Sequence, residues 1–305
     1  MELLFESRSN IIRQWGKLRP CRARPDILPE PVMTGTTPLD GRGVQLYGTV
    51  LRDGGRFRMW YQAHPQGFAR MSSPYVAVAE SEDGFDWRKP PLNRVEFNGD
   101  KRNNLCSLGL HCPTVFIDPD APPSHRYRAS GSRKRFLEGA ARRSGYYTSH
   151  SPDGVNWTLD APEPRWPWED VVNSVYHPRR RCGLTALKRT HRVNGVVRRA
   201  IWEAEYRDGD WREPRSVLVP DSYDDIRAQA HGYALGDYYG MGMMPAGQGM
   251  VGFPWHFRYG GAAGFGSVDL GLAFQESAGG AWLHFPGRPD FISHEDLPWA
   301  PGGIY

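Results

Sequence analysis

The sequence has no apolar run long enough to cross a membrane, and its mean hydropathy is −0.60. The first residues, Met1 to Glu6, lack the basic flank and apolar core of a signal peptide. Only 4 of the 305 residues are cysteines, and none shows Cys-x-x-Cys or zinc-finger spacing. We therefore expect a cytoplasmic protein with free thiols and no membrane partner.

Strong charge of one sign and helical periodicity are also missing. A net charge of +4 is too small to indicate nucleic acid as a partner, and no binding motif for nucleic acid accompanies it. No stretch sustains an apolar period of 3.6 residues, so little helix is expected. The chain is instead 12% aromatic and contains 35 glycines, which favours short strands joined by turns.

What the chain does have is a repeated phrase. Ser-x-Asp-Gly-x-x-Trp occurs at 81–87 and 151–157, and weaker copies end at Trp211 and Trp282. Asp-Gly predicts a hairpin turn in which both central residues have positive φ, and the tryptophan can wedge between neighbouring sheets. The four tryptophans are separated by 70, 54 and 71 residues, the length of a four-stranded unit with variable loops. This spacing predicts a β-propeller, with residues 1–305 as one domain.

Short runs of β-branched and aromatic residues surround each copy of the phrase and divide into four predicted blades. Those of the first two blades lie at 46–51, 57–61, 75–79 and 85–88, then at 114–117, 127–129, 146–148 and 155–157. Those of the next two lie at 174–176, 184–187, 199–204 and Trp211, then at 233–234, 238–241, 270–274 and Trp282.

The residues of these units resemble a known group of enzymes. Tyr47–Leu51 followed by Phe57–Tyr61, then Ala79–Trp87 and His111–Phe116, is similar to the invertase/levanase and arabinanase/xylosidase group of glycoside hydrolases. The resemblance implies an all-β, five-bladed propeller and a sugar substrate. The chain ends where this group begins its fifth blade, so that blade is assembled from residues 3–12 and the tail 301–305, completed by a partner subunit, or absent. We expect the N-terminal strand to close the ring.

The chain departs from the group at the positions that carry catalysis. The resemblance implies one carboxylate at the start of each of the first three blades, but the matching residues here are Gln45, His111–Pro113 and Val171, with Asp170 one residue away. Glycoside hydrolysis needs two carboxyl groups with separated pKa values. Either the acids have moved, or the chemistry is not ordinary hydrolysis.

Propeller geometry selects the candidate site. The first strand of each blade begins near the axis on one face, and the loop between the second and third strands returns to that face. The pocket expected there collects candidate catalytic residues, Asp170, Asp225, His111 and Asp40, and candidate substrate-binding residues, Gln45, Asn173, Arg227, His231, Trp255 and Asp269. No set of ligands with diagnostic spacing is present, so we expect no cofactor and no essential metal.

Several of these residues have a structural alternative. Asp40 could cap its turn, His111 could be a satisfied core histidine, and Cys112 beside it could be a small buried residue rather than a nucleophile. Asp225 could be a solvated loop carboxylate, and Asp269 could tie down the preceding loop through backbone hydrogen bonds.

Two kinds of loop are predicted to overhang the pocket. Basic residues at 132–135 and 142–143, and at 188–199, could attract an anionic ligand or simply keep the surface soluble. The Gly- and Met-rich stretch 241–266 is predicted to be a long loop, either a lid in which Trp255 stacks on a sugar or a loop packed on the rim.

The sequence thus favours a glycoside hydrolase-like enzyme that acts on a sugar or sugar-containing small molecule, which could be anionic, by Asp and His acid–base chemistry. Hydrolysis, elimination and isomerisation all stay open. The alternative is a carbohydrate-binding propeller without catalysis, which the replaced carboxylates would also explain. The oligomeric state is left open.

Overall fold

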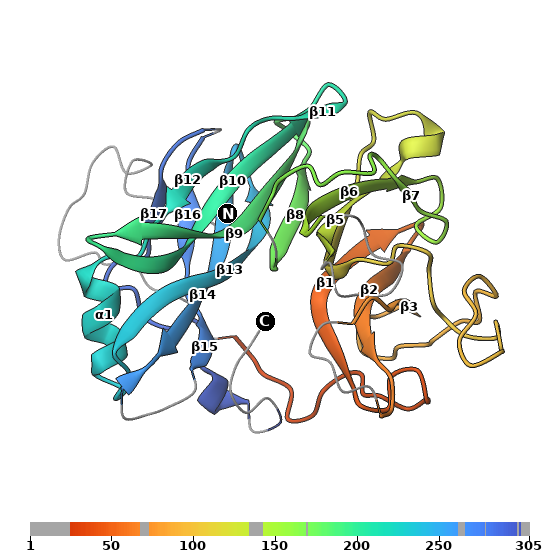
Figure 1. Cartoon of the computed structure of the whole chain (residues 1–305), viewed down its shortest axis with the longest axis horizontal. Helices are drawn as coiled ribbons and strands as arrows, with labels where there is room; N and C mark the ends of the chain where they lie inside the picture. Colours follow the sequence, from red (N-terminus) through yellow and green to blue (C-terminus); the bar gives the residue numbers. More distant parts are fainter. Residues whose placement is uncertain are drawn as a thin grey trace, which may run out of the picture.

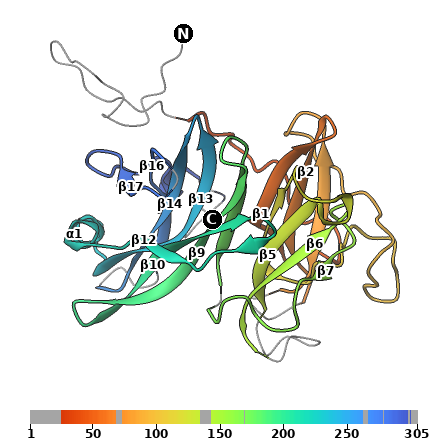
Figure 2. The same cartoon turned by 90° about the horizontal axis from the view of Figure 1, so that it is seen from above.

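Four antiparallel sheets follow one another along the chain in the computed structural model (Figure 1). The structure describes residues 25–67, 73–133, 143–168, 170–261, 266–277, 279–297 and 299. Within this part the prediction of an all-β propeller is confirmed. The one α-helix of these residues, α1 (Ser222–Gln229), lies on the outer side of the last sheet, as Figures 1 and 2 show.

Each sheet is one blade, and its first strand is the innermost. Blade 1 contains β1 (Gly43–Asp53), β2 (Arg56–His64) and β3 (Val76–Ser81). Blade 2 contains β4 (His111–Ile117), β5 (Tyr127–Arg133), β6 (Gly145–Ser151) and β7 (Thr158–Leu159).

The other two blades are larger. Blade 3 contains β8 (Val172–His177), β9 (Cys182–Val193), β10 (Val196–Arg207), β11 (Asp210–Trp211) and β12 (Arg215–Leu218). Blade 4 contains β13 (Leu235–Ala246), β14 (Gly249–Tyr259), β15 (Ser267–Leu270), β16 (Ala273–Gln275) and β17 (Trp282–His284). Short 3₁₀ helices, η2 (Pro123–His125) and η4 (His294–Asp296), lie in connections.

The core consists of apolar layers between neighbouring blades. Trp60 and Tyr127 are in the layer between blades 1 and 2, Phe116 and Tyr206 in the layer between blades 2 and 3, and Leu184 in the layer between blades 3 and 4. Innermost strands β1, β4, β8 and β13 are neighbours in that order. Blade 4 meets blade 1 through the rings of Trp255 and Tyr47, whose centroids are 6.2 Å apart.

The expectation of five blades is wrong, because the described residues form four. The face of blade 1 that points away from blade 2 is covered by the chain's own segments. Leu39 and Leu105 pack there against Tyr61, joined by partly buried Met33 and Phe97. A neighbouring blade is therefore not needed to bury this face. The segments expected to close the ring, 3–12 and 301–305, lie outside the described residues.

The Ser-x-Asp-Gly-x-x-Trp phrases form loops with identical hydrogen bonds. In the first, the Ser81 hydroxyl accepts from the Gly84 amide, and Asp83 Oδ1 accepts from the amides of residues 85 and 86. The Trp87 indole then donates to the Gly84 carbonyl at 2.9 Å. Residues 151–157 repeat every one of these bonds. Only the glycine has positive φ here, so the predicted two-residue hairpin turn occurs instead at Asp208-Gly209, where φ is 54° and 83°.

The stretch 241–266 is not the long loop that its glycines indicated. Most of it lies in β13 and β14, which form a hairpin closed at Gly247-Gln248. Similarly, the basic residues of 188–199 lie on β9 and β10 and not in an overhanging loop, since the turn is only Asn194-Gly195. The blade 2 basic segment, 132–135 and 142–143, falls mostly outside the described residues.

Candidate active site at the propeller axis

Three of the four innermost strands contain a β-bulge. The pairing register shifts between Gln45 and Thr49 in β1, between His111 and Thr114 in β4, and between Tyr238 and Met241 in β13. A bulge bends its strand and redirects side chains, and bulges are frequent beside active sites. The bulged residues Tyr47, Cys112 and Tyr239 meet in one cluster that also includes Val171 and Trp255.

Glycine is required at the first of these bulges. A Cβ atom at Gly48 would lie 1.7 Å from the carbonyl oxygen of Trp60, so no larger residue fits without moving β2. The bulge in β4 places Cys112 at φ 48°, a conformation that non-glycine residues rarely adopt. The axial ends of these strands are thus held in shapes that side chains disfavour.

Asp170 completes the axial cluster from the start of blade 3. It immediately precedes Val171 and β8, and its φ is 117°, which is strained for a residue with a side chain. Its Oδ2 accepts a hydrogen bond from the Tyr239 hydroxyl at 3.0 Å and forms an ion pair with Lys188. Strained backbone of this kind is concentrated at functional sites.

Two basic side chains lie over the Tyr239 ring, and one of them, Lys188, pairs with Asp170. Lys188 from β9 has its Nζ 4.1 Å from the centre of the Tyr239 ring, and burial lowers the pKa of this amine although Asp170 opposes the shift. Arg199 from β10 lies over the Phe257 ring at 5.0 Å and pairs with Asp237. The axial carboxylate therefore lies among cations that could also hold an anionic group of a ligand.

His111 and Cys112 lie next to Asp170, as the topology predicted. One ligand atom from each of the three residues lies within 4.8 Å of the others, so this trio could hold a divalent ion with nitrogen, sulfur and oxygen donors. Asp170 is already neutralised by Lys188, however, which lowers the benefit of a metal there. The expectation that no metal is essential stays a prediction.

Three predicted substrate-binding residues lie on the inner strands of the propeller but differ in what their side chains contact: Gln45, Asn173 and Trp255. Gln45 Oε1 is 3.1 Å from Nε2 of His64. Asn173 lies on β8 three residues after Asp170, and its buried Oδ1 has no partner among the described residues. Trp255 is 4% exposed and packs on Tyr47, so it belongs to the axial core of β14 and not to a lid.

Four predicted residues lie instead around blade 4. Asp225 accepts two hydrogen bonds from Arg198, and Arg227 bonds to Asp290 and to His256. Asp269 is fully buried against Arg258 at 2.7 Å, and it also accepts hydrogen bonds from Ser293 and His294. His231 follows α1 on the exposed surface.

Asp40 lies on the outer side of blade 1, beside Tyr61. It is 0% exposed and accepts hydrogen bonds from Thr37 and Tyr61. Burial alone would raise the pKa of this carboxyl, but Lys89 at 2.5 Å and the bonds from Thr37 hold the pKa below its usual value. These contacts are the ones that the turn-capping alternative requires.

The sequence therefore located His111, Cys112 and Asp170 together but missed Tyr239 and Lys188, which contact Asp170. Tyr239 is followed by Gly240 within a strand, and a glycine inside a strand pattern is a signal for a bulge. In the sequence, Lys188 is only one of several basic residues in the same stretch. Its distance from Asp170 depends on β8 and β9 pairing, with Val172 opposite Leu187.

Known structures share the fold. A protein of Parabacteroides distasonis proposed to be a glycoside hydrolase is 16% identical over 93% of this chain and 88% of its own, with a TM-score of 0.52. A glycosyl hydrolase from Bacteroides ovatus is 16% identical over 83% and 72%, at 0.51. BT0996, in a complex with RGII, is 10% identical over 85% and 78%, at 0.55.

These likenesses show that the protein shares the β-propeller fold of structures described as glycoside hydrolases. No family model and no curated protein matches the chain. Among the described residues no helix is long and apolar enough to span a membrane.

Proposed function

We propose that this protein is a sugar-acting enzyme that transfers protons at the axial cluster of Asp170, Tyr239, His111 and Lys188. The observation that carries the proposal is the strained Asp170, held between the Tyr239 hydroxyl and the Lys188 amine beside His111. Likeness in fold to proteins described as glycoside hydrolases supports sugars as the substrate class.

A non-hydrolytic reaction fits this cluster better than hydrolysis. A hydrolase needs two carboxyl groups roughly 5–10 Å apart across an open site. Asp170 is the one carboxylate among the described residues of the cluster, whereas Asp225 and Asp269 are each paired with an arginine. The other axial groups are an imidazole, a phenol and two cations, which suit proton transfer next to a carboxylate on the sugar.

Elimination from a uronic acid is the reaction that uses every group. Lys188 and Arg199 would bind the sugar carboxylate and stabilise the negative charge that develops on it. His111 would take the proton from the adjacent carbon while the bond to the leaving oxygen breaks. The Tyr239 hydroxyl would return a proton to that oxygen, with Asp170 orienting the phenol.

A carbohydrate-binding propeller without catalysis is the second candidate. Cys112, Val171 and Trp255 are at most 4% exposed and fill part of the axis with apolar side chains. Such packing leaves less room for a substrate chain than an open catalytic funnel. A binding protein would keep the cations but would not need strained Asp170.

The test is to incubate the protein with neutral and uronic-acid oligosaccharides and follow two signals. Elimination produces new reducing ends together with the ultraviolet absorbance of a new C=C bond, and hydrolysis produces reducing ends alone. A binding protein gives neither signal but releases or absorbs heat on titration. Reducing ends without absorbance would contradict the elimination, and silence in all three measurements would contradict both candidates.

A further inference from the structure

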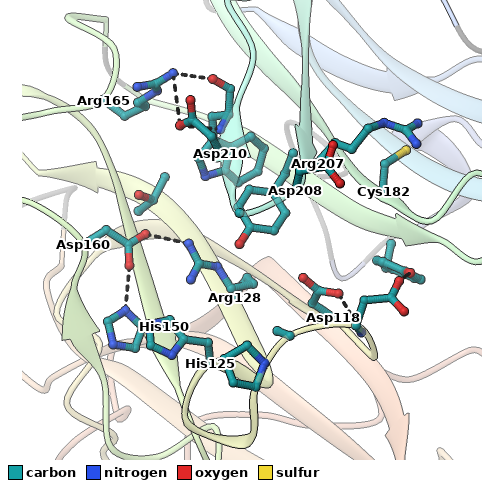
Figure 3. A pocket seen from close by; sticks show the side chains of 18 of the residues that line it. Asp118, His125, Arg128, His150, Asp160, Arg165, Cys182, Arg207, Asp208 and Asp210 are labelled. Atoms are coloured by element: carbon teal, nitrogen blue, oxygen red, sulfur yellow. Dashed lines mark hydrogen bonds and ion pairs between the residues drawn. The ribbon is translucent and has the colours of Figure 1, made fainter.

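A cavity of about 1080 Å³ lies between blades 2 and 3 (Figure 3). Asp118 follows the last residue of β4, Tyr176 lies near the end of β8, and Arg207 ends β10. His111 and Asp170 lie at the opposite ends of β4 and β8, about 20 Å away at the usual rise per strand residue. The cavity is therefore separate from the axial cluster.

The polar side chains on the blade 2 side are fixed by one another. Asp160 accepts a hydrogen bond from Arg128 at 3.0 Å and lies 2.7 Å from Nδ1 of His150. The His150 ring in turn stacks on His125, with centroids 3.8 Å apart and planes 11° from parallel. Because these groups are already held in place, a ligand that contacts them loses little free energy in ordering them.

Aromatic rings form the blade 3 side. Tyr206 and Trp211 pack with centroids 5.1 Å apart, and the Arg128 guanidinium lies 4.8 Å above the Tyr206 ring. Burial raises the pKa of the Tyr206 hydroxyl; nearby Arg128 opposes the shift and Asp118 adds to it. The hydroxyl therefore stays protonated and available as a donor near neutral pH.

The charges around the cavity nearly cancel. Five arginines and six carboxylates line it, and Figure 3 shows Arg128 and Asp118 of blade 2 across from Asp208 and Asp210 of blade 3. A polyanion would meet the carboxylates and a cation would meet the arginines, so neither is well suited. A ligand whose groups each donate and accept hydrogen bonds suits a surface of alternating sign.

We propose that this inter-blade cavity binds a neutral oligosaccharide independently of the axial cluster. Sugar hydroxyls would donate to Asp118 and Asp208 and accept from the arginine donors and the Tyr206 hydroxyl, while the buried rings of Tyr206 and Trp211 keep that side of the cavity rigid. The cavity would hold a sugar chain on the propeller face opposite the axial cluster. Its volume is close to the upper end of the roughly 300–1,000 Å³ typical of ligand sites, which is room for a short chain.

The experiment is a calorimetric titration with xylo-, arabino-, cello- and malto-oligosaccharides, and with oligogalacturonides as charged comparators. Ala161→Trp places a large ring in the cavity from an exposed position. Ala230→Trp, on the exposed residue after α1, is its matched control. Asp118→Asn removes one acceptor charge, and Asp170→Asn alters only the axial cluster.

We expect at least one neutral oligosaccharide to bind. Ala161→Trp should lower its affinity by filling the cavity, and Asp118→Asn should lower it by weakening a charged hydrogen bond, each by about tenfold or more. Ala230→Trp and Asp170→Asn should leave its affinity unchanged, with thermal denaturation confirming that each variant is folded. The proposal is overturned if no neutral sugar binds, if Ala161→Trp and Asp118→Asn have no effect, or if Asp170→Asn abolishes binding. Tighter binding of oligogalacturonides that Ala161→Trp weakens and Asp170→Asn leaves intact would place charged sugars in this cavity and overturn the neutral class.

Discussion

The axial cluster and the charged residues around blade 4 both contain carboxylates beside basic side chains, but they differ in how completely these groups are satisfied. Asp237 and Asp269 of blade 4 are 0% exposed, and each pairs with a buried arginine. Asp170 keeps 21% of its side chain exposed and has a strained backbone. Complete burial with matched partners indicates a structural role, whereas partial exposure with strain indicates chemistry.

The largest effect expected on stability comes from Asp269→Asn. This change leaves the cation of Arg258, which is 3% exposed, with Asp290 as its one carboxylate partner among the described residues. We expect a loss of about 3 kcal/mol in the free energy of unfolding, as breaking a buried ion pair usually costs. Urea denaturation measures it. A change below about 0.5 kcal/mol, the usual range of surface substitutions, would contradict a structural role for the buried ion pairs of blade 4.

The largest effect expected on activity comes from Asp170→Asn and Tyr239→Phe. Each should lower turnover per folded molecule about 100-fold or more by removing help with proton transfer, and thermal denaturation gives the folded fraction of each variant. Asp86→Asn and Tyr223→Phe, on exposed residues elsewhere in the chain, are the matched controls. Full activity in both axial variants would end the proposal for this site.

Blade 4 should also make the stability of the protein depend on pH, through His284. Burial, with Arg288 nearby, lowers the pKa of His284 to about 3 from its ordinary 6.5. The unfolded chain therefore binds a proton between these values that the folded chain does not, so stability is complete above pH 6.5 and falls as pH drops toward 3.

Over that window the loss attributable to His284 should approach about 1.4 kcal/mol per pH unit. Denaturation of His284→Gln at a series of pH values should give a shallower slope than the native chain. Equal slopes in the two proteins would show that other groups cause the acid sensitivity.

The smallest effect is expected for Asp225→Asn. Its side chain is 22% exposed and bonds to Arg198, which keeps Asp237 as a second partner. We expect a loss of about 1.5 kcal/mol in stability and near-native turnover per folded molecule. A 100-fold fall in turnover with unchanged stability would instead return Asp225 to the catalytic set that its chain position suggested.

The fold was largely readable from the sequence because the tryptophan repeat marks every blade. The number of blades was not, since it depends on how residues 33–39 and 87–105 cover blade 1. Strand alternation could not reveal that contact, which joins segments far apart in the chain. The stretch 241–266 was misread because Pro254 and its glycines resemble a loop, although Pro254 pairs with Met241 inside a sheet.

The candidate site was predictable only in part, because topology places residues but does not show their partners. Topology alone placed His111 and Asp170 at the axial start of their blades, and the structure keeps them together. Whether a carboxylate is already paired depends on partners such as Arg198 for Asp225 and Lys89 for Asp40, which are 27 and 49 residues away. Tertiary packing brings these partners into contact, and no local pattern in a single sequence shows which partners will meet.

The second Ser-x-Asp-Gly-x-x-Trp loop, 151–157, is also bonded to the neighbouring blade. The carbonyl of Gly154 accepts a hydrogen bond from the indole of Trp60 at 2.7 Å, and Arg58 donates to the carbonyl of Asp153. These two bonds tie the blade 2 loop directly to β2 of blade 1. Blades 1 and 2 should accordingly lose their amide protection together, as one cooperative unit of unfolding.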